Sequence, residues 1–442
     1  MIHRLRSAPT AVVTVIQNFG WMVASRGLAA VFSLVYLAIV TRTLGVAEFG
    51  KFALITGAAV MLSNLLVFPT WQMIVQYGIA HLERDDEPAL ARLYRGALVL
   101  DVISAVVGIV LSAVILYYFS DALGLKDTLA RTTMVFNAIM LLSLRSTPLG
   151  ILRLRNRFSL AAAADSATPT FRLIGAITAG LVHPTLQAFL IAWGVAELLT
   201  AAAHWWAVYR VGEMRLLFAR AKDSGLLLSE NPGIVRYALT TNFSLSLMIG
   251  TQQLPLFLVG GLTGISAAGA FRLAAQLSRS LTTVSQMIAR SAFPEIVRAV
   301  RSTGVGSLGS VIGRSARLTL TVGAVVFLLV TLFGMPILEL IGGKDFGSAY
   351  ASLLWLAAAG CIELAVVAFE PSIAAANRAH LAFYVRVAAA ALLLAAALML
   401  APVLGAQGVA LAVFVQALAQ ALLLGLVLMY LIREGTSPQL QS

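Results

Sequence analysis

Five arginines lie within long apolar stretches of the sequence, where charged side chains are rare. We expect Arg145 to serve helix packing, Arg172 fits packing as well as function, and the other three are candidates for binding. Arg26 falls in the stretch over 19–40, and Arg272 and Arg279 fall in the stretch over 268–289. An ionised side chain at the centre of a bilayer costs about 2.5–3.5 kcal/mol on insertion scales, so it is expected to face protein or water and to have a function. A guanidinium group binds phosphate through two parallel hydrogen bonds and stays charged at physiological pH. We therefore predict that these three arginines bind an anionic group.

Amide side chains near these arginines have the spacing of a helix face. Gln276 lies between Arg272 and Arg279 at intervals of four and three residues, which places all three on one side of a helix. Amide groups can exchange hydrogen bonds with sugar hydroxyls. The other candidate amides fall on the predicted polar faces of three other stretches; they are Asn18, Gln72, Asn242 and Gln253. An alternative interpretation is that the arginines extend to the membrane interface or pair with acidic residues for packing alone.

Acidic side chains inside or near the apolar stretches are candidates for ion coupling. A carboxylate held within the bilayer can gain and lose a proton, or bind a cation, during a transport cycle. The candidates are Asp165, Glu197, Glu363 and Glu370. Arg172 lies seven residues after Asp165 on the same predicted helix face, so a charge network that only packs helices together is an alternative interpretation. The histidines lack the spacing of a metal site, and we predict no metal site.

The composition requires that the elements holding these side chains lie in a membrane. Of the 442 residues, 60% are hydrophobic and 11% are charged, whereas soluble domains are about 25% charged. A helix needs about 20 apolar residues to cross the hydrocarbon core. The sequence therefore predicts an all-α polytopic membrane protein. Hydropathy predicts twelve crossing helices, with eleven or thirteen as alternatives, near 19–40, 52–77, 96–119, 132–152, 160–181, 187–209, 237–260, 268–289, 318–341, 351–373, 382–402 and 408–432.

The basic residues predict the orientation of these helices. The formal net charge is +12, and most Lys and Arg residues fall in alternate loops rather than on one clustered face. This pattern excludes nucleic acid as an expected partner, and the positive-inside rule places both termini in the cytoplasm. The first apolar stretch is too long, and too interrupted by Arg26, for a cleaved signal peptide. The sequence contains no glycine-rich phosphate loop followed by Lys and Ser or Thr, so we expect no cofactor.

An internal repeat predicts that the chain consists of two related halves. The pattern G-x4-G-x-F runs from Gly45 to Phe52 and recurs from Gly264 to Phe271, in each case where an outside turn is predicted. Transporters are commonly built from two structural halves whose similarity survives weakly in the sequence. We predict two six-helix halves, related by an axis along the membrane normal, over 1–220 and 221–442.

With these motifs the sequence resembles the Wzx-type polysaccharide biosynthesis flippases of the multidrug/oligosaccharidyl-lipid/polysaccharide exporter (MOP) superfamily. The resemblance is carried by the six-plus-six repeat and by the segments Asn18 to Arg26, Arg42 to Gly50 and Phe271 to Gln276. It implies two six-helix lobes in a V-shaped bundle around a central cavity. It also implies that the first, second, seventh and eighth helices line this cavity, and that transport proceeds by alternating access.

The resemblance further implies a substrate and a setting. The expected substrate is an undecaprenyl-diphosphate-linked oligosaccharide, moved from the cytoplasmic to the periplasmic leaflet of a bacterial inner membrane. The product would serve the synthesis of the O-antigen of lipopolysaccharide, of capsule or of exopolysaccharide. The protein would then be a transporter and not an enzyme. Its expected partners are the lipid-linked substrate, membrane lipids, a polysaccharide polymerase and a chain-length regulator. The glycan and the energy source, whether proton, sodium or none, stay open.

Two other functions are less consistent with the sequence. A drug/cation antiporter of the same superfamily should have an acidic cavity, whereas the four predicted cavity helices contain Arg26, Arg272 and Arg279 and no Asp or Glu. A membrane polymerase or ligase of lipid-linked glycans should have a large outside loop for acceptor chemistry, whereas the predicted outside loops are short. The sequence therefore favours a flippase with an anionic substrate.

Overall fold

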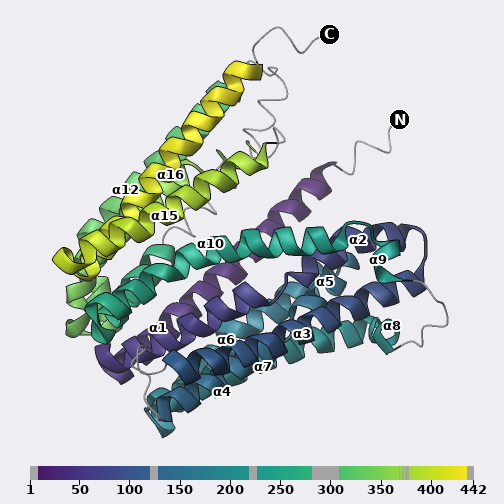
Figure 1. The fold of residues 1–442 in the computed structure, drawn as a ribbon, viewed down its shortest axis with the longest axis horizontal. Helices are drawn as coiled ribbons and strands as arrows, with labels where there is room; N and C mark the ends of the chain where they lie inside the picture. The colour runs from purple at the N-terminus through teal and green to yellow at the C-terminus, as the bar shows by residue number, and fades with distance from the viewer. Residues whose placement is uncertain are drawn as a thin grey trace. The chain divides into compact units, whose positions relative to one another are not determined.

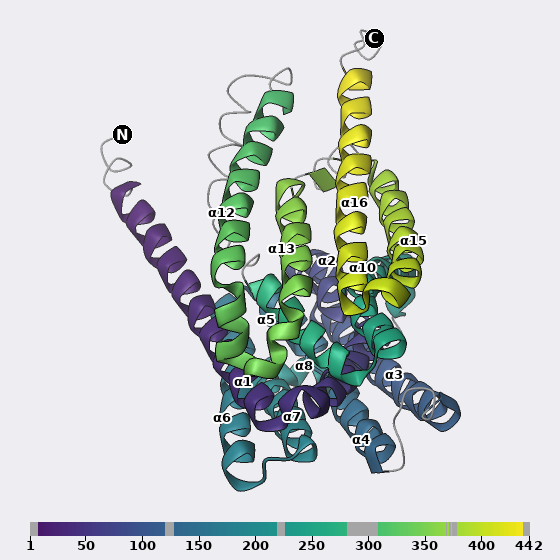
Figure 2. The same ribbon diagram turned by 90° about the vertical axis from the view of Figure 1, so that its left-hand side faces the viewer.

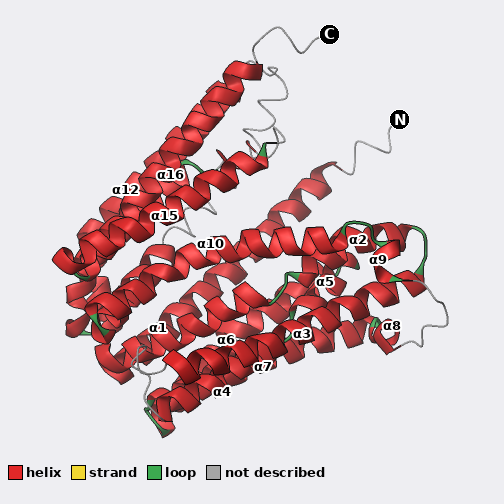
Figure 3. Ribbon diagram, in the orientation of Figure 1, coloured by secondary structure: helices red, strands yellow, loops and turns green. Residues whose placement is uncertain are grey.

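The computed structural model of the protein describes most of the chain. It covers residues 8–119, 128–218, 226–280, 308–367, 369–370, 373 and 378–435, and over 8–28 it describes the backbone without the side chains. Asn18 and Arg26 therefore lie in a described helix, but their predicted binding role concerns side chains outside the described set. Every regular element in this part of the chain is a helix (Figure 3). The predicted all-α fold is confirmed.

The helices gather into two compact units. Unit 1 comprises Met1–Thr43 and Leu62–Phe243, and unit 2 comprises Leu44–Met61 and Ser244–Ser442. Each unit therefore draws on both of the halves expected from the repeat. The division into halves at 1–220 and 221–442 stays a prediction, because it concerns the ancestry of the two halves rather than their packing.

Unit 1 is centred on four long helices that run along one another, namely α3, α4, α6 and α7 (Figure 1). Contacts between α6 and α7, between α3 and α4, and between α4 and α7 hold this group together. Short helices after α7 complete the unit, together with the first part of α10. The helices are α1 (Ala8–Leu66, in part), α2 (Thr70–Glu83), α3 (Glu87–Phe119), α4 (Thr128–Leu142), α5 (Ser146–Leu154), α6 (Phe158–Val182), α7 (Leu186–Val211), α8 (Met214–Phe218), α9 (Leu227–Glu230) and α10 (Ile234–Thr263, in part).

Unit 2 contains a second group of long helices. Figure 2 shows α12, α13, α15 and α16 side by side, and α13 contacts both α12 and α16 while α15 contacts α16. A further helix over 265–280 follows α10. The named helices are α12 (Leu308–Gly342), the 3-10 helix η2 (Lys344–Ala349), α13 (Tyr350–Ala365), α15 (Ala379–Leu404) and α16 (Ala406–Gly435).

Nine segments within the described residues are long and apolar enough to cross a membrane. The first, Ala29–Glu83, has 55 residues and is long enough for two crossings, since one crossing takes about 20 residues. The segment over 268–289 runs into undescribed residues, so the number twelve stays a prediction. Apolar side chains on the outside of the helices are exposed, for example Leu181 at 82% and Val403 at 80%. Such surfaces suit lipid, and the protein is a polytopic membrane protein.

The repeated glycine motif brings two helices of unit 2 into backbone contact. Gly45 and Gly264 have φ of 71° and 104°, a left-handed conformation that glycine adopts without the usual steric cost. One turn further on, the positions of Gly50 and Gly269 leave no space for a side chain. A Cβ atom on Gly50 would lie 2.0 Å from the carbonyl oxygen of Ile265. The two copies of the motif therefore pack against each other.

Two of the predicted crossing helices in unit 1 are interrupted, which the hydropathy pattern did not predict. The stretch over 52–77 breaks between α1 and α2 at residues 67–69, and the stretch over 132–152 breaks between α4 and α5 at residues 143–145. Pro69, which lacks an amide hydrogen, directly precedes α2. Each break exposes the amide groups of a new helix N-terminus, and in hydrocarbon these donors must find partners within the protein.

Asp101 of α3 supplies partners at both breaks. Its fully buried carboxylate accepts hydrogen bonds from the Thr70 hydroxyl at 2.8 Å, from the Thr147 hydroxyl at 2.7 Å and from the Thr147 amide at 3.1 Å. The Ser146 hydroxyl in turn accepts from the Trp71 amide at 3.1 Å. A carboxylate at a helix N-terminus is also favoured by the helix dipole. Asp101 thus caps α5 from a neighbouring helix and anchors the beginning of α2.

We expect Asp101→Ala to lower the stability of the folded protein. The substitution leaves three buried donors without their acceptor, and each such group costs about 1–3 kcal/mol. Thermal unfolding in detergent, followed by size-exclusion chromatography, measures the effect. Glu83→Ala removes an exposed carboxylate from the same unit and is the control. Equal unfolding midpoints for Asp101→Ala and Glu83→Ala would contradict the capping role.

We expect Gly50→Ala to lower the unfolding midpoint as well. The new methyl group would collide with the backbone oxygen of Ile265, and overpacking of this kind costs about 1–3 kcal/mol. The matched control is Gly261→Ala in α10, where an added Cβ meets nothing within 4 Å. In a helix this control should be neutral or stabilising, since Ala is the better helix former by about 1 kcal/mol. A Gly50→Ala protein as stable as the control would show that the two motifs do not pack as described.

Candidate functional site

Three polar pairs join α6 and α7, which lie side by side in unit 1 (Figure 1). Asp165, Thr168 and Arg172 follow one face of α6, and their partners on α7 are His204, Thr200 and Glu197. The Arg172 guanidinium forms a salt bridge with the Glu197 carboxylate. The Thr168 and Thr200 hydroxyls are 3.1 Å apart, and Nε2 of His204 lies 3.2 Å from Oδ1 of Asp165. We call these three pairs the α6–α7 ladder.

Glu197 is the centre of a larger charge cluster at one end of the ladder. Its side chain is 1% exposed and also accepts a hydrogen bond from Arg145, at the α4–α5 break, at 3.0 Å. The Arg172 guanidinium lies 3.8 Å from the centre of the Trp193 ring, a cation–π contact. One carboxylate thus balances two guanidinium groups. This arrangement favours the packing interpretation for Arg145 and Arg172, while the predicted ion-coupling role of Glu197 stays untested.

In unit 2 the structure brings together two of the predicted substrate ligands. Arg272 on the helix over 265–280 donates to Oε1 of Gln253 on α10 at 3.2 Å. Arg279 on the same helix donates to the main-chain oxygen of Gln252 at 2.7 Å. Gln276 lies between the two arginines on this helix and is half-buried. Two guanidinium groups and two amides therefore belong to one helix pair, α10 and 265–280.

The remaining carboxylates of unit 2 have cationic neighbours. Glu363 on α13 lies close enough to Arg279 to interact with it electrostatically. Glu370 forms a salt bridge with Arg386 of α15 at 2.6 Å and a hydrogen bond with Gln420 of α16 at 3.3 Å. The four predicted ion-coupling residues thus divide by partner. Three have a permanently charged arginine beside them, whereas Asp165 faces a histidine.

The other two predicted amide ligands lie in unit 1, near the α1–α2 break. Asn242 of α10 donates to the main-chain oxygen of Leu65 at 3.2 Å, and Gln72 lies in the first turn of α2. Asn242 therefore satisfies a carbonyl at the end of α1. Because the structure describes the two units separately, the cavity that all these residues are expected to share stays a prediction.

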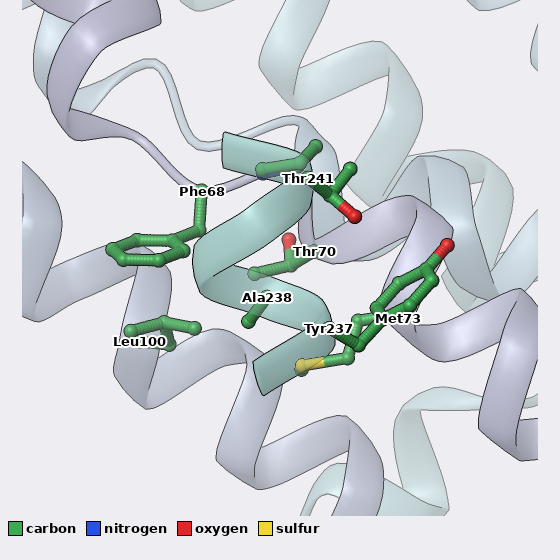
Figure 4. Close-up of a pocket in the computed structure, with 8 residues that line it drawn as sticks. Phe68, Thr70, Met73, Leu100, Tyr237, Ala238 and Thr241 are labelled. Atoms are coloured by element: carbon green, nitrogen blue, oxygen red, sulfur yellow. The ribbon is translucent and has the colours of Figure 1, made fainter. Parts of the chain in front are cut away.

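A small pocket lies at the same break. Its walls come from the α1–α2 break, α2, α3 and α10, and Figure 4 shows the Tyr237 and Thr241 side chains beside it. The lining residues are Phe68, Pro69, Thr70, Met73, Leu100, Tyr237, Ala238 and Thr241. None of them is charged, so this pocket does not suit a phosphate group.

His204 is the residue that the sequence reasoning missed. A signal for it was present, because Asp165 and Arg172 are seven residues apart on one predicted helix, and Glu197 and His204 are seven residues apart on the next. Consecutive crossing helices are antiparallel, so the two equal spacings can bring Arg172 next to Glu197 and Asp165 next to His204. Among the described residues, no group of three His, Cys, Asp or Glu side chains is arranged to hold a metal ion.

Glu197→Gln should destabilise the protein, because it leaves two guanidinium groups without their counter-charge. Breaking one partner of a buried ion pair costs about 3–5 kcal/mol. The double variant Arg172→Gln with Glu197→Gln should recover part of this loss, since it removes one of the unbalanced charges. Thermal unfolding of the two variants makes the comparison. A double variant less stable than Glu197→Gln would contradict the assigned pairing.

Comparisons with known proteins identify a matching family and solved structures with a similar fold. Residues 15–300 match the family described as "Polysaccharide biosynthesis protein". The chain is 28% identical over 342 residues to Inner membrane protein YghQ of Escherichia coli (strain K12), covering 76% of this chain and 95% of that protein. Among solved structures, it is similar to the lipid II flippase MurJ in an inward closed conformation, with a TM-score of 0.69 and 12% identity over 93% of this chain and 88% of MurJ.

A second solved structure is an inward-facing multidrug resistance MATE family transporter of the MOP superfamily. Its TM-score is 0.63 at 13% identity, over 92% of this chain and 96% of that one. At such identities, the likeness to MurJ and to the MATE transporter shows a common fold. The predicted resemblance to Wzx-type members of this superfamily is thereby confirmed for family and fold. Since the family match extends over well more than half of the sequence, this chain belongs to the polysaccharide biosynthesis protein family.

Proposed function

We propose that this protein is a membrane flippase for a lipid-linked oligosaccharide whose anchor is undecaprenyl diphosphate. The observation that carries the proposal is the paired arginine face over 265–280, where Arg272 and Arg279 accompany Gln276 and contact the Gln252–Gln253 segment. Membership of the polysaccharide biosynthesis family and a fold shared with a lipid II flippase support a substrate that carries both glycan and lipid.

Two hydrogen bonds of these arginines go to neutral acceptors that a phosphate oxygen could replace. Arg272 binds a neutral side-chain amide and Arg279 binds a main-chain carbonyl. A phosphate group carries the opposite charge, and it can accept two parallel hydrogen bonds from one guanidinium group. A diphosphate would therefore replace the carbonyl and amide oxygens as acceptor, and the amides of Gln253 and Gln276 would become available to sugar hydroxyls. The polyprenyl chain would stay in the surrounding lipid.

Glu363 could couple phosphate binding at Arg279 to a proton or another cation. Its carboxylate interacts with Arg279 in the described state, so an arriving phosphate would compete with it for the same guanidinium. Protonation of Glu363, or binding of a cation to it, would remove this competition. Glu197 and Glu370 are weaker candidates for coupling because each forms a salt bridge with arginine at 3.0 Å or less.

The setting we propose is the bacterial inner membrane, with both termini in the cytoplasm. The relative from Escherichia coli is named as an inner membrane protein, which supports this location. Arg26 and Asn18 of α1 and Gln72 and Asn242 of unit 1 would complete the cavity between two six-helix halves that move by alternating access. The flipped glycan would serve O-antigen, capsule or exopolysaccharide synthesis, handed on to a polymerase and a chain-length regulator.

We expect Arg272→Ala and Arg279→Gln each to reduce flipping at least tenfold. Loss of one charge-assisted hydrogen bond costs about 1.5–3 kcal/mol, and 1.4 kcal/mol corresponds to a factor of about ten. The assay reconstitutes the protein in vesicles with a lipid-linked oligosaccharide and measures how much of it becomes accessible to an outside glycan-modifying enzyme. Arg131→Gln, which removes an exposed arginine at the beginning of α4, is the matched control.

Each variant is first checked for folded protein by size-exclusion chromatography. Full flipping by both Arg272→Ala and Arg279→Gln would remove the cationic face from the mechanism. Absence of flipping by the wild type with any lipid-diphosphate glycan, combined with export of a cationic dye, would favour the antiporter instead.

A further inference from the structure

The pair of Asp165 and His204 in the α6–α7 ladder differs from the other two pairs in its hydrogen-bonding chemistry. His204 is fully buried, and its Nδ1 lies 2.9 Å from the main-chain oxygen of Thr200. A carbonyl oxygen can only accept, so Nδ1 must carry a hydrogen atom. The other ring nitrogen, Nε2, lies 3.2 Å from Oδ1 of Asp165.

This tautomer creates a conflict that a proton resolves. A neutral imidazole with its hydrogen on Nδ1 presents a lone pair at Nε2, and an ionised carboxylate presents only lone pairs. Without an added proton, two acceptors would face each other at 3.2 Å inside the protein. In the described state this contact lacks the alignment of a hydrogen bond, so the two side chains must rotate slightly when the proton binds. One proton between Nε2 and Oδ1 turns this repulsive contact into a hydrogen bond.

Other charged or titratable groups lie on the ladder and on the helices packed against it. On the ladder itself, the neighbours are Arg172 and Glu197, with Arg145 from the α4–α5 break. On α5, Arg153 stacks on the Trp71 ring at 4.1 Å, and α4 carries Arg131 near its beginning. On α1, Tyr36 contacts Trp193, with ring centres 5.9 Å apart. The guanidinium groups of Arg145 and Arg172 share one carboxylate, so this cluster does not supply the His204 ring with a second anion.

Asp165 is the exposed member of the pair. Its side chain is 54% exposed although it lies in the second turn of α6, a helix rich in alanine. A carboxylate facing lipid at this depth is costly, so the exposed side must face water or another part of the protein. The buried imidazole can therefore exchange its proton through the carboxylate rather than directly.

We propose that Asp165 and His204 form a proton-binding site between α6 and α7. The site takes up one proton from water to form the hydrogen-bonded pair, and it returns that proton to water when the pair separates. Proton uptake then strengthens the contact between α6 and α7, and proton release weakens it through repulsion of the lone pairs. Only the use of this site to drive transport rests on the proposed flippase function.

Nitrogen NMR on histidine-labelled protein in nanodiscs tests the site directly, since the chemical shift of Nε2 reports whether it carries a proton. The His204 signals are assigned by their loss in His204→Gln. In the wild type we expect a proton on both ring nitrogens of His204 when the pair with Asp165 is formed. In Asp165→Asn we expect loss of the Nε2 proton, because the asparagine amide can itself donate to Nε2 and keep the pair intact. Glu83→Gln, at an exposed acid outside the ladder, should leave His204 unchanged.

His183, an exposed histidine at the end of α6, is the internal reference for titration. The proposal is overturned if Nε2 of His204 stays unprotonated in the wild type throughout the pH range in which His183 changes from charged to neutral. It is also overturned if Asp165→Asn leaves the His204 signals unchanged while the protein stays folded.

A vesicle assay then separates this site from the proposed transport function. With an imposed pH gradient, Asp165→Asn should lose the gradient-driven increase in flipping but keep exchange in the absence of a gradient. Unchanged gradient dependence would overturn a driving role for the pair. If no lipid-linked glycan moves in any variant while the NMR shows the shared proton, the proton site stands and the flippase assignment fails.

Discussion

Inside hydrocarbon every polar group of the chain must find its partner within the protein, and this requirement explains most of the structure. The two broken crossing helices are tolerated because Asp101 binds both Thr70 and Thr147. The ladder between α6 and α7 pairs three polar residues of one helix with complementary residues of the next. Where no side chain fits, as at Gly50, backbones come into direct contact. The need of polar groups for hydrogen-bond partners and the close packing of backbones together determine which helices are neighbours.

The same requirement separates structural arginines from those suited to bind a ligand. Arg145 and Arg172 share the buried carboxylate of Glu197, and this arrangement would lose much if a substrate replaced it. One hydrogen bond of Arg272 goes to the neutral amide oxygen of Gln253, and an anion in its place would add an opposite charge. In the proposed function an anion therefore binds on the helix over 265–280, while the charges of α6 and α7 stay paired with one another.

Much of this could be predicted from the sequence, and the limits have physical causes. Apolar length predicts crossing helices, and the repeated glycine motif is visible as a pattern, because both are local properties of the chain. The breaks at residues 67–69 and 143–145 were missed because hydropathy does not register a missing helical hydrogen bond. The sequence left a packing role and a functional role open for Arg172. Its partner Glu197 lies on another helix, and only the antiparallel arrangement of α6 and α7 brings them together. His204 was missed for the same reason.

The central claim is that a cationic helix face in this membrane protein recognises a diphosphate. Native mass spectrometry of the purified wild-type protein with undecaprenyl diphosphate and with uncharged undecaprenol tests it most directly. The account predicts a stable one-to-one complex with the diphosphate at concentrations where the uncharged alcohol does not bind. Equal binding of the two lipids would contradict it, because recognition would then rest on the polyprenyl chain and not on the arginines.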